Sequence, residues 1–438
     1  MGLKEFRNKI KRNLMPELKE QPMQYWEEMS FMIVIPMEND DQAENEFVQR
    51  IAALPDVNVI KSRQPEADNP GLVRFEYRGK EYTAGFRAAD FSLPDVSSVL
   101  KQSMSSSETE ALEKADRAMT VFMRFEGQPQ ECYHLQLRLC CAAFTSIAAV
   151  MDESAEQMLS GRWVRMAAAS TVLPSSTALY TVQAISGENG SVWLHTHGLC
   201  RCGITELEIL ESDAENADNH FQIIKALAGR LIGGDKGDMG NDVYYIGMIG
   251  DEIPVVATYR SWTTGLAEYN NPSPGGVGDR QDGHNSRTSL VFLYRGPKDQ
   301  EKGVLSKVSL YDGLWADNAM FFIGKKETER MSALARERYS FLRKAAGDSN
   351  NKILLKLGLP TDEKYRNEDG GNDYEHIWFE ALSFDDNGFS ARLTQKPYYI
   401  DGLDEGYIGN YTCDDITDWV IGTPEQAVTP DNIYLLEE

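Results

Sequence analysis

Short apolar runs, each about as long as one β-strand, recur along the chain and constrain its fold more than any other feature. Residues 30–36 read SFMIVIP, and a second such run, TSLVFLY, begins at Thr288. The strand-like segments Val73–Tyr77 and Glu81–Phe86 are separated only by a short turn, which predicts a hairpin. Because these strands come in unequal groups joined by hairpins, the sequence predicts an α+β fold with mixed and antiparallel sheets.

Stretches of helical length lie between the strand-like runs. We predict helices over residues 42–54, 133–150, 221–231 and 325–346, the last of which is basic. From residue 374 onward the pattern consists of short strands and turns, which is typical of a small β-barrel. Helices are therefore expected to pack on the sheets of a multidomain protein that ends in a β-barrel-like domain.

The length of 438 residues predicts about two or three domains. Changes in composition divide the chain further. We predict an N-terminal basic helix or extension over 1–30, an α+β domain over 31–250, a second α+β region over 251–350 that ends in the basic helix, and a small, mainly β C-terminal domain over 351–438.

The charge balance narrows the classes of partner. Acidic residues outnumber basic ones by 68 to 44, which gives a formal net charge of −24. This argues against nucleic-acid binding, because phosphate neutralisation needs a basic face, and against docking on an anionic membrane. A basic protein partner suits such a surface. The acids concentrate at the C-terminus, where residues 401–438 hold ten acidic residues and neither Lys nor Arg.

The expected location is the cytoplasm. No stretch approaches about 18 uninterrupted apolar residues, and the basic N-terminus is not followed by the apolar run of a signal peptide. Of the six cysteines, the adjacent pair Cys140-Cys141 and the pair Cys200-x-Cys202 are poorly placed for disulfides. Free thiols fit a reducing compartment.

The densest group of chemically active residues follows Trp193. The segment reads WLHTHGLCRCG and continues to Glu206-Leu207-Glu208. On a strand, side chains alternate between two faces, so His195 and His197 share one face, about 7 Å apart. Such a pair can chelate a divalent metal. The third ligand would come from among Cys200, Cys202, Glu206 and Glu208.

The same residues also fit a half-buried strand whose histidines bond to the backbone or to solvent. Cys200 or Cys202 could act as a nucleophile beside Arg201, but catalytic triads are assembled across several elements and not along one strand. Paired carboxylates are numerous, and at this net charge most of them form a solvated face. The sequence therefore favours a protein that is not an enzyme.

The segment Trp193–Leu210 resembles an uncharacterised bacterial family catalogued as domain of unknown function 4026, and its relative, domain of unknown function 4261. The residues that carry the resemblance follow the pattern T-x-G-x-x-x-x-G-x-x-E-L-E and are Thr196, Gly198, Gly203, Glu206, Leu207 and Glu208. The resemblance covers about residues 31–250 and brings no accepted activity or catalytic residue.

A second stretch, from residue 374 to the end, is similar to a family catalogued as domain of unknown function 2314. The matching residues are Trp378, Gly388, Pro397, Asp418 and Trp419. We expect Trp419 to lie in the core of the small domain and Asp418 to close a turn. The resemblance implies an interaction or toxin-immunity role, because such domains occur in bacterial proteins suspected of these roles.

These observations lead to three hypotheses of function. The leading one is a cytosolic bacterial interaction protein, such as an immunity or antitoxin-like factor for a basic toxin. The alternatives are a metal-binding or metal-dependent hydrolase-like module centred on His195 and His197, and a structural scaffold. The uneven charge adds one expectation, that the basic helix lies against the acidic C-terminal domain while the remaining acidic surface faces a partner.

Overall fold

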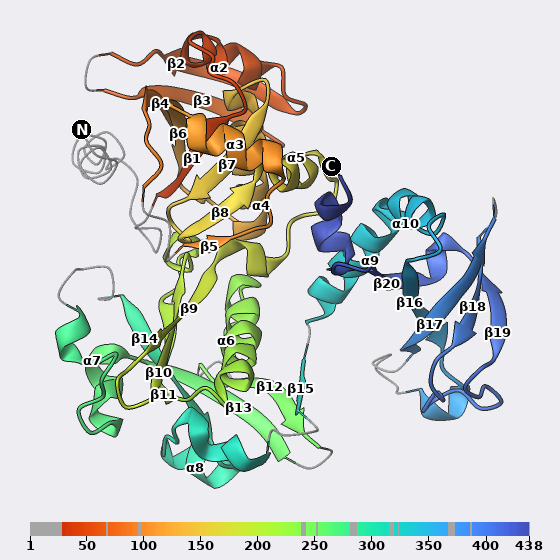
Figure 1. Cartoon of the computed structure of the whole chain (residues 1–438). Helices are drawn as coiled ribbons and strands as arrows, with labels where there is room; N and C mark the ends of the chain where they lie inside the picture. The colour runs from red at the N-terminus through yellow and green to blue at the C-terminus, as the bar shows by residue number, and fades with distance from the viewer. Residues whose placement is uncertain are drawn as a thin grey trace. The chain divides into compact units, whose positions relative to one another are not determined.

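The computed structural model describes residues 29–66, 69–94, 99–237, 242–250, 253–280, 287–314, 319–322, 324–366, 373–385 and 388–437. Helices and mixed or antiparallel sheets both form, so the predicted α+β class is confirmed (Figure 1). The chain divides into two compact units. The first unit comprises Met1–Ala169 and Ser176–Phe322, and the second comprises Ser170–Ser175 and Ile323–Glu438. The predicted N-terminal helix or extension lies outside the described residues as far as residue 28, because the described part of the chain begins at residue 29.

The first sheet of the first unit has eight strands in the order β2-β3-β4-β6-β1-β7-β8-β5. These are β1 (Ser30–Pro36), β2 (Val57–Arg63), β3 (Gly71–Tyr77), β4 (Lys80–Asp90), β5 (Leu100–Lys101), β6 (Arg117–Met123), β7 (Ile147–Asp152) and β8 (Gln157–Ser160). Neighbouring strands are antiparallel except for β5 and β8.

Helices cover both faces of this sheet. One face packs on α2 (Ala43–Ala52), α4 (Pro129–Ala143) and α5 (Gly161–Ala169), and the other packs on α3 (Ser106–Lys114). Strand β1 lies in the middle, and all of its residues are buried. Burial on both faces explains why its sequence is apolar throughout and does not alternate.

The predicted helix over 133–150 is wrong at its C-terminal end. Helix α4 stops at Ala143, and Ile147–Asp152 forms the buried strand β7 between β1 and β8. A continuous apolar run cannot reveal by its periodicity whether it is a buried helix or a strand buried on both faces.

The second sheet of the first unit has seven strands in the order β15-β12-β13-β14-β11-β10-β9. These are β9 (Thr181–Ser186), β10 (Val192–His197), β11 (Glu206–Ser212), β12 (Tyr244–Ile249), β13 (Ile253–Ser261), β14 (Thr288–Tyr294) and β15 (Ala319–Phe321). Only β11 and β14 pair in parallel. The predicted domain boundary near residue 250 falls between the paired strands β12 and β13.

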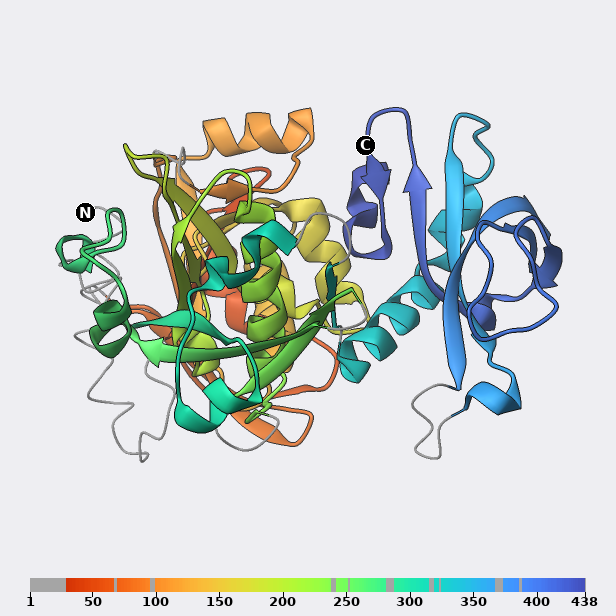
Figure 2. The ribbon, with the colours of Figure 1, turned by 90° about the horizontal axis from the view of Figure 1, so that it is seen from below.

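The two faces of this sheet are covered differently. Helix α6 (Ala217–Ile232) packs on one face through Ile223, Ile224 and Leu227. The segment after β13, which includes α7 (Trp262–Gly265), packs on the other face, where Tyr269 contacts a cluster with Trp193. Figure 2 shows α6 and α7 on opposite sides of the sheet. A further helix, α8 (Pro297–Lys302), follows β14.

The second unit contains a half-barrel sheet of six antiparallel strands in the order β19-β18-β17-β16-β20-β21. These are β16 (Lys352–Pro360), β17 (Tyr374–Phe384), β18 (Phe389–Leu393), β19 (Ile408–Tyr411), β20 (Ile416–Gly422) and β21 (Ala427–Val428). The β-barrel-like prediction for the C-terminal domain is therefore confirmed in this open form.

The predicted basic helix forms two helices, α9 (Lys325–Glu337) and α10 (Tyr339–Ala345), and α9 packs on β20. Arg330 of α9 forms an ion pair of 2.9 Å with Asp431, which lies in the acidic C-terminal segment. The expectation that the basic helix lies against the acidic domain is confirmed by this contact. Within the described residues, no helix has the length and apolar character that a membrane crossing requires.

Candidate functional site

The segment Trp193–Glu208 folds into a hairpin, which we call the signature hairpin. Strand β10 ends at His197, the 3₁₀ turn Cys200–Cys202 follows, and β11 returns antiparallel to β10. Gly198 has a φ of 115°, and a Cβ atom there would lie 2.4 Å from the carbonyl oxygen of Leu179. Gly203 has a φ of 73°. Both motif glycines are therefore explained by backbone geometry.

The carboxylate of Glu206 holds this turn together. Its Oε1 accepts hydrogen bonds of 2.9 Å from the backbone N–H groups of Gly198 and Cys200, and its Oε2 accepts one of 2.6 Å from Thr196 Oγ1. Thr196 Oγ1 in turn accepts a bond from the N–H of Leu207. Burial raises the pKa of Glu206 to about 7, although these hydrogen bonds oppose the shift. Thr196 and Glu206 thus fix the turn from inside.

Glu208 takes part in a different buried network. It accepts bonds of 2.6 and 2.9 Å from the two terminal nitrogens of Arg280 and one of 2.8 Å from Trp193 Nε1. The side chains of Glu208 and Arg280 are 0% and 1% exposed. Arg280 also donates to the carbonyl oxygen of Gly275 and lies 4.9 Å from the ring centroid of Trp262. Glu208 therefore anchors the segment after β13 to the sheet.

A third buried pair joins the signature hairpin to the first sheet. Arg201 donates bonds of 2.7 and 2.9 Å to the two carboxylate oxygens of Asp152, at the end of β7, and both side chains are 0% exposed. The guanidinium also lies 5.0 Å from the ring centroid of Tyr133. Sequence reasoning missed both Arg280 and Asp152 as partners of the motif, because no pattern links positions so far apart along the chain.

His195 and His197 lie on the same face of β10, as predicted. Their Nε2 atoms are 3.1 Å apart, and His195 Nε2 lies 3.3 Å from Gln183 Oε1 on β9. Gln183 donates to Glu156, whose Oε2 lies 4.0 Å from His197 Nε2. The two imidazoles therefore belong to a polar cluster with Gln183 and Glu156.

The structure places the predicted third metal ligands elsewhere. Cys200 Sγ lies 4.0 Å from the carbonyl oxygen of Arg287, and the buried Cys202 Sγ lies 3.8 Å from that of Gly198. Glu206 and Glu208 are occupied in the networks described above. Across the described residues, no group of three or more His, Cys, Asp or Glu side chains is arranged to hold a metal ion.

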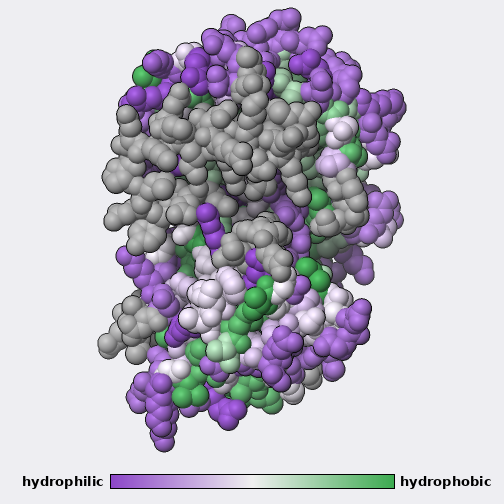
Figure 3. Space-filling model, turned by 90° about the vertical axis from the view of Figure 1, so that its left-hand side faces the viewer, coloured by the Kyte–Doolittle hydropathy of each residue, from purple (hydrophilic) through white to green (hydrophobic). Residues whose placement is uncertain are grey.

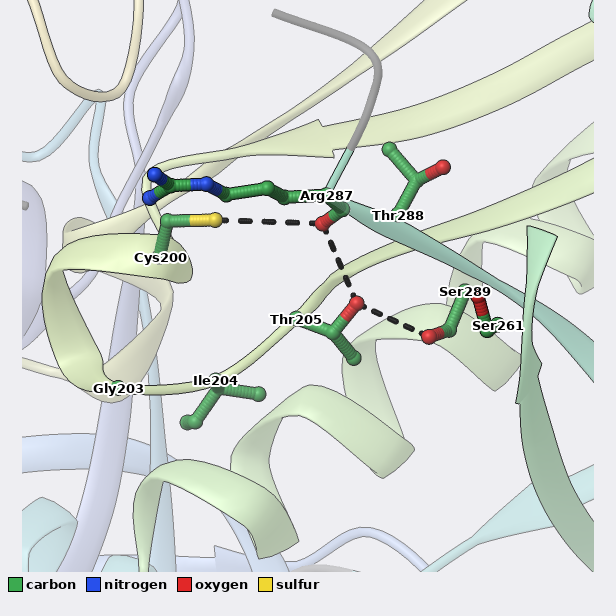
Figure 4. Close-up of a pocket in the computed structure, with 8 residues that line it drawn as sticks. All are labelled: Cys200, Gly203, Ile204, Thr205, Ser261, Arg287, Thr288 and Ser289. Atoms are coloured by element: carbon green, nitrogen blue, oxygen red, sulfur yellow. Dashed lines mark hydrogen bonds between the residues drawn. The ribbon is translucent and has the colours of Figure 1, made fainter. Parts of the chain in front are cut away.

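A pocket of about 290 Å³ adjoins the signature hairpin (Figure 4). It is lined by Cys200, Gly203, Ile204, Thr205, Ser261, Arg287, Thr288 and Ser289. Thr205 Oγ1 lies 2.9 Å from Ser289 Oγ and donates to the carbonyl oxygen of Arg287. Figure 4 shows the Arg287 side chain extended past Cys200, away from the hydroxyl groups of Thr205 and Ser289. The cation and the hydroxyl groups therefore do not converge on one point.

Figure 3 shows one face of the molecule, on which hydropathy is uneven. Hydrophilic residues dominate its upper edge, whereas hydrophobic and near-neutral residues gather in the lower half. In Figure 1, the seven-stranded sheet lies in the lower half of the first unit. The more apolar part of this face therefore belongs to the half of the first unit that carries the signature hairpin.

In the second unit, two of the candidate site residues, Trp378 and Asp418, lie on the same face of the sheet. Lys356 on β16 is the cross-strand neighbour of Trp378 on β17 and of Asp418 on β20. Lys356 Nζ lies 5.6 Å from the ring centroid of Trp378. Asp418 therefore lies within a strand and does not close a turn, which corrects the prediction. Burial raises the pKa of Asp418.

Trp419 points to the opposite face of β20. Its side chain is 0% exposed, and its Nε1 donates a hydrogen bond of 2.9 Å to the carbonyl oxygen of Ala335 on α9. The predicted core position of Trp419 is confirmed. The sheet face that carries Trp378 is more open. Leu354 and Ile408 lie on this face and are 39% and 55% exposed. They belong to one cross-strand row together with Glu380 and Arg392.

Several tyrosines of the second unit are exposed. Tyr374, Tyr398 and Tyr407 are 59%, 80% and 47% exposed. The carboxylate of Glu375 accepts hydrogen bonds of 2.8 Å from the backbone N–H groups of Tyr398 and Tyr399, which fixes the backbone that carries them. The sequence signal was present in the Tyr-rich composition of this region, but exposure could not be inferred from it.

Comparison with known families accounts for most of the described chain. Residues 30–174 match the family described as "Protein of unknown function (DUF4026) N-terminal", and residues 182–292 match its C-terminal counterpart. Residues 329–433 match "Uncharacterized protein conserved in bacteria (DUF2314)". No curated protein and no solved structure was found to match the chain. The DUF2314 match includes most of α9 and all of α10, which the predicted extent of that resemblance left out.

Proposed function

We propose that this chain, which belongs to the DUF4026 family of proteins of unknown function and carries a DUF2314 domain, acts by binding a basic protein partner through its second unit. The observation that carries the proposal is the set of exposed tyrosines on the second unit, whose C-terminal residues 401–438 hold ten acidic residues and neither Lys nor Arg.

The tyrosines supply the contact area that a binding surface needs. Tyrosine is enriched at protein interfaces because its ring buries a large apolar area while its hydroxyl can still form a hydrogen bond. Tyr398 is 80% exposed, and its backbone is held by Glu375. A side chain on a backbone that is already ordered loses less conformational freedom on binding.

The charge of the same unit selects the partner. Three exposed acidic residues follow Tyr398 and Tyr399 in the sequence, namely Asp401, Asp404 and Glu405. Two of them already have cationic neighbours, because Asp401 pairs with Lys364 and Asp404 lies 3.1 Å from Lys396. From Asp401 to the C-terminus, however, the sequence supplies ten acids and no basic residue. Such an excess attracts a basic protein and speeds its association at low salt.

An immunity or antitoxin-like role is one specific form of this function, with a basic toxin as the partner. The buried networks of the signature hairpin support a binding role as well. Glu206 and Glu208 hold the turn and Arg280 in place, so the family motif supplies a rigid scaffold in the first unit.

The test is capture of partners by the full-length chain from cells that encode it, at about 50 mM salt, compared with a Tyr398→Ala, Tyr399→Ala double variant. We expect one or more basic proteins to be retained by the original chain, to bind more weakly as salt rises, and to be lost by the variant. A matched control is Tyr245→Ala, because Tyr245 is also exposed but lies in the first unit. If the variant and the original chain retain the same proteins, or if the retained proteins are acidic, the proposal fails.

A further inference from the structure

Strand β19 is the edge of the half-barrel sheet, and its sequence lacks the proline and charged residues that often protect an edge. Within the described residues, its one strand partner is β18. Its sequence, Ile-Gly-Asn-Tyr, contains no proline and no charged residue. Proteins commonly block edge strands with Lys, Pro, a bulge or a covering element, because an open edge can pair with another chain.

The opposite edge of the same sheet shows the contrast. Strand β21 has two residues, lies between Pro424 and Pro430 in the sequence, and contacts the 3₁₀ helix Pro430–Leu436 that follows it. That edge is short and covered. Within the described residues, the β21 edge is therefore protected, whereas β19 contains neither a proline nor a charged residue.

The register of β18 and β19 shows which backbone groups face outward. The pairs run from Phe389 with Tyr411 to Arg392 with Ile408, and the N–H of Leu393 donates to the carbonyl oxygen of Tyr407. In an antiparallel ladder, hydrogen-bonded and non-hydrogen-bonded pairs alternate. Ile408 and Asn410 are therefore in non-hydrogen-bonded pairs, so their N–H and C=O groups point away from β18. The side chains of both residues are also exposed.

Carboxylates lie at both ends of this open edge. Asp404 and Glu405 precede β19, Asp414 and Asp415 follow it, and all except Asp415 are exposed. Four residues of strand span roughly 13 Å. Asp404 is paired with Lys396, so a segment that pairs with β19 would meet the charge of Glu405 near one end and that of Asp414 near the other. Uncharged residues lie between them.

We infer that β19 is a docking edge to which a basic partner adds an extended segment as a seventh strand, with Lys or Arg flanking a short uncharged β-forming core. The inference rests on the proposed function and specifies its mode of binding. Backbone hydrogen bonds to Ile408 and Asn410 supply the pairing, and the flanking carboxylates supply the selectivity for a basic segment.

The test uses the full-length chain and a synthetic peptide, KKVTVTVKK, whose fluorescent label allows binding to be followed by anisotropy. The control peptide carries Glu in place of each Lys. The decisive variants are Asn410→Pro, which removes an outward N–H group, and Asn410→Ala, which removes the side chain but keeps that N–H. Proline is tolerated at sheet edges, so the fold is expected to survive.

We expect the lysine peptide to bind, the glutamate peptide not to bind, Asn410→Pro to weaken binding by roughly fivefold to tenfold, and Asn410→Ala to leave it nearly unchanged. Amide hydrogen exchange of the unmodified chain should also slow at Ile408 and Asn410 when the peptide is present, which keeps the inference testable if the proline variant unfolds. Absence of lysine-peptide binding, or binding without protection of β19, overturns the inference. The proposed function is judged separately by the capture experiment with Tyr398 and Tyr399.

Discussion

Arg201 and Asp152 form an ion pair that is completely buried and links the two sheets of the first unit. Arg201 follows β10 in the seven-stranded sheet, Asp152 ends β7 in the eight-stranded sheet, and two hydrogen bonds of 2.7 and 2.9 Å join them. Because each charge is compensated only by the other and by nearby polar groups, the pair makes the two sheets depend on each other.

Removal of one charge from this pair should destabilise the first unit strongly. We expect Asp152→Asn to lower the free energy of unfolding by about 3–5 kcal/mol, because the charge of Arg201 would remain buried without its partner. The measurement is urea unfolding of the full-length chain followed by circular dichroism. The matched control is Glu81→Gln, which breaks an ion pair with Arg74 where both side chains are more than half exposed, and which should change the free energy by less than about 1 kcal/mol. Equal effects of the two variants would contradict the assignment.

The sequence predicted the local features of the candidate site and missed the distant ones. The shared face of His195 and His197 follows from alternation along one strand, and the glycines of the motif indicated turns. The partners of Glu208 and Arg201 could not be found in this way, because Arg280 and Asp152 lie 72 and 49 residues from them. The same limit explains why a helix was predicted where strand β7 forms, because burial on both faces depends on neighbours that are remote in sequence.

Stability of the first unit should depend on the protonation of Glu206. Burial raises the pKa of Glu206 in the folded chain to about 7 from its ordinary value of 4.5. The folded state therefore holds a proton that the unfolded state has lost between these two pH values. Stability from this group is greatest below about pH 4.5 and declines as the pH rises to about 7, by about 3 kcal/mol in total.

The Glu206→Gln variant tests this dependence. Its amide cannot ionise, so the stability of the variant should lack the decline with pH that the original chain shows. Urea unfolding between pH 5 and 8 should show the free energy of unfolding of the variant rising relative to that of the original chain as the pH rises. A constant difference would mean that Glu206 is already ionised in the folded state at pH 5.

The cluster around His195 and His197 should be stable without a metal ion. The imidazoles contact each other, Gln183 and Glu156, and no described group of three or more candidate ligands is arranged around a metal position. We expect addition of Zn²⁺, or of a chelator, to shift the melting temperature by less than about 2 °C, which corresponds to about 1 kcal/mol for a unit of this size. A larger rise with Zn²⁺ that is abolished by His195→Ala would restore the metal-binding hypothesis.

Two tryptophans of the second unit should differ sharply in their effect on stability. Trp419 is fully buried and hydrogen-bonded to Ala335, whereas Trp378 lies on the opposite, more open face beside Lys356. Trp419→Ala should lower the free energy of unfolding by about 3–5 kcal/mol and unfold the half-barrel, because it leaves a large cavity between β20 and α9. Trp378→Ala is the matched control and should lower it by less than half as much. Thermal unfolding followed by circular dichroism compares the two, and a cooperative transition for Trp419→Ala at the original temperature would contradict the role of Trp419 in holding α9 on the sheet.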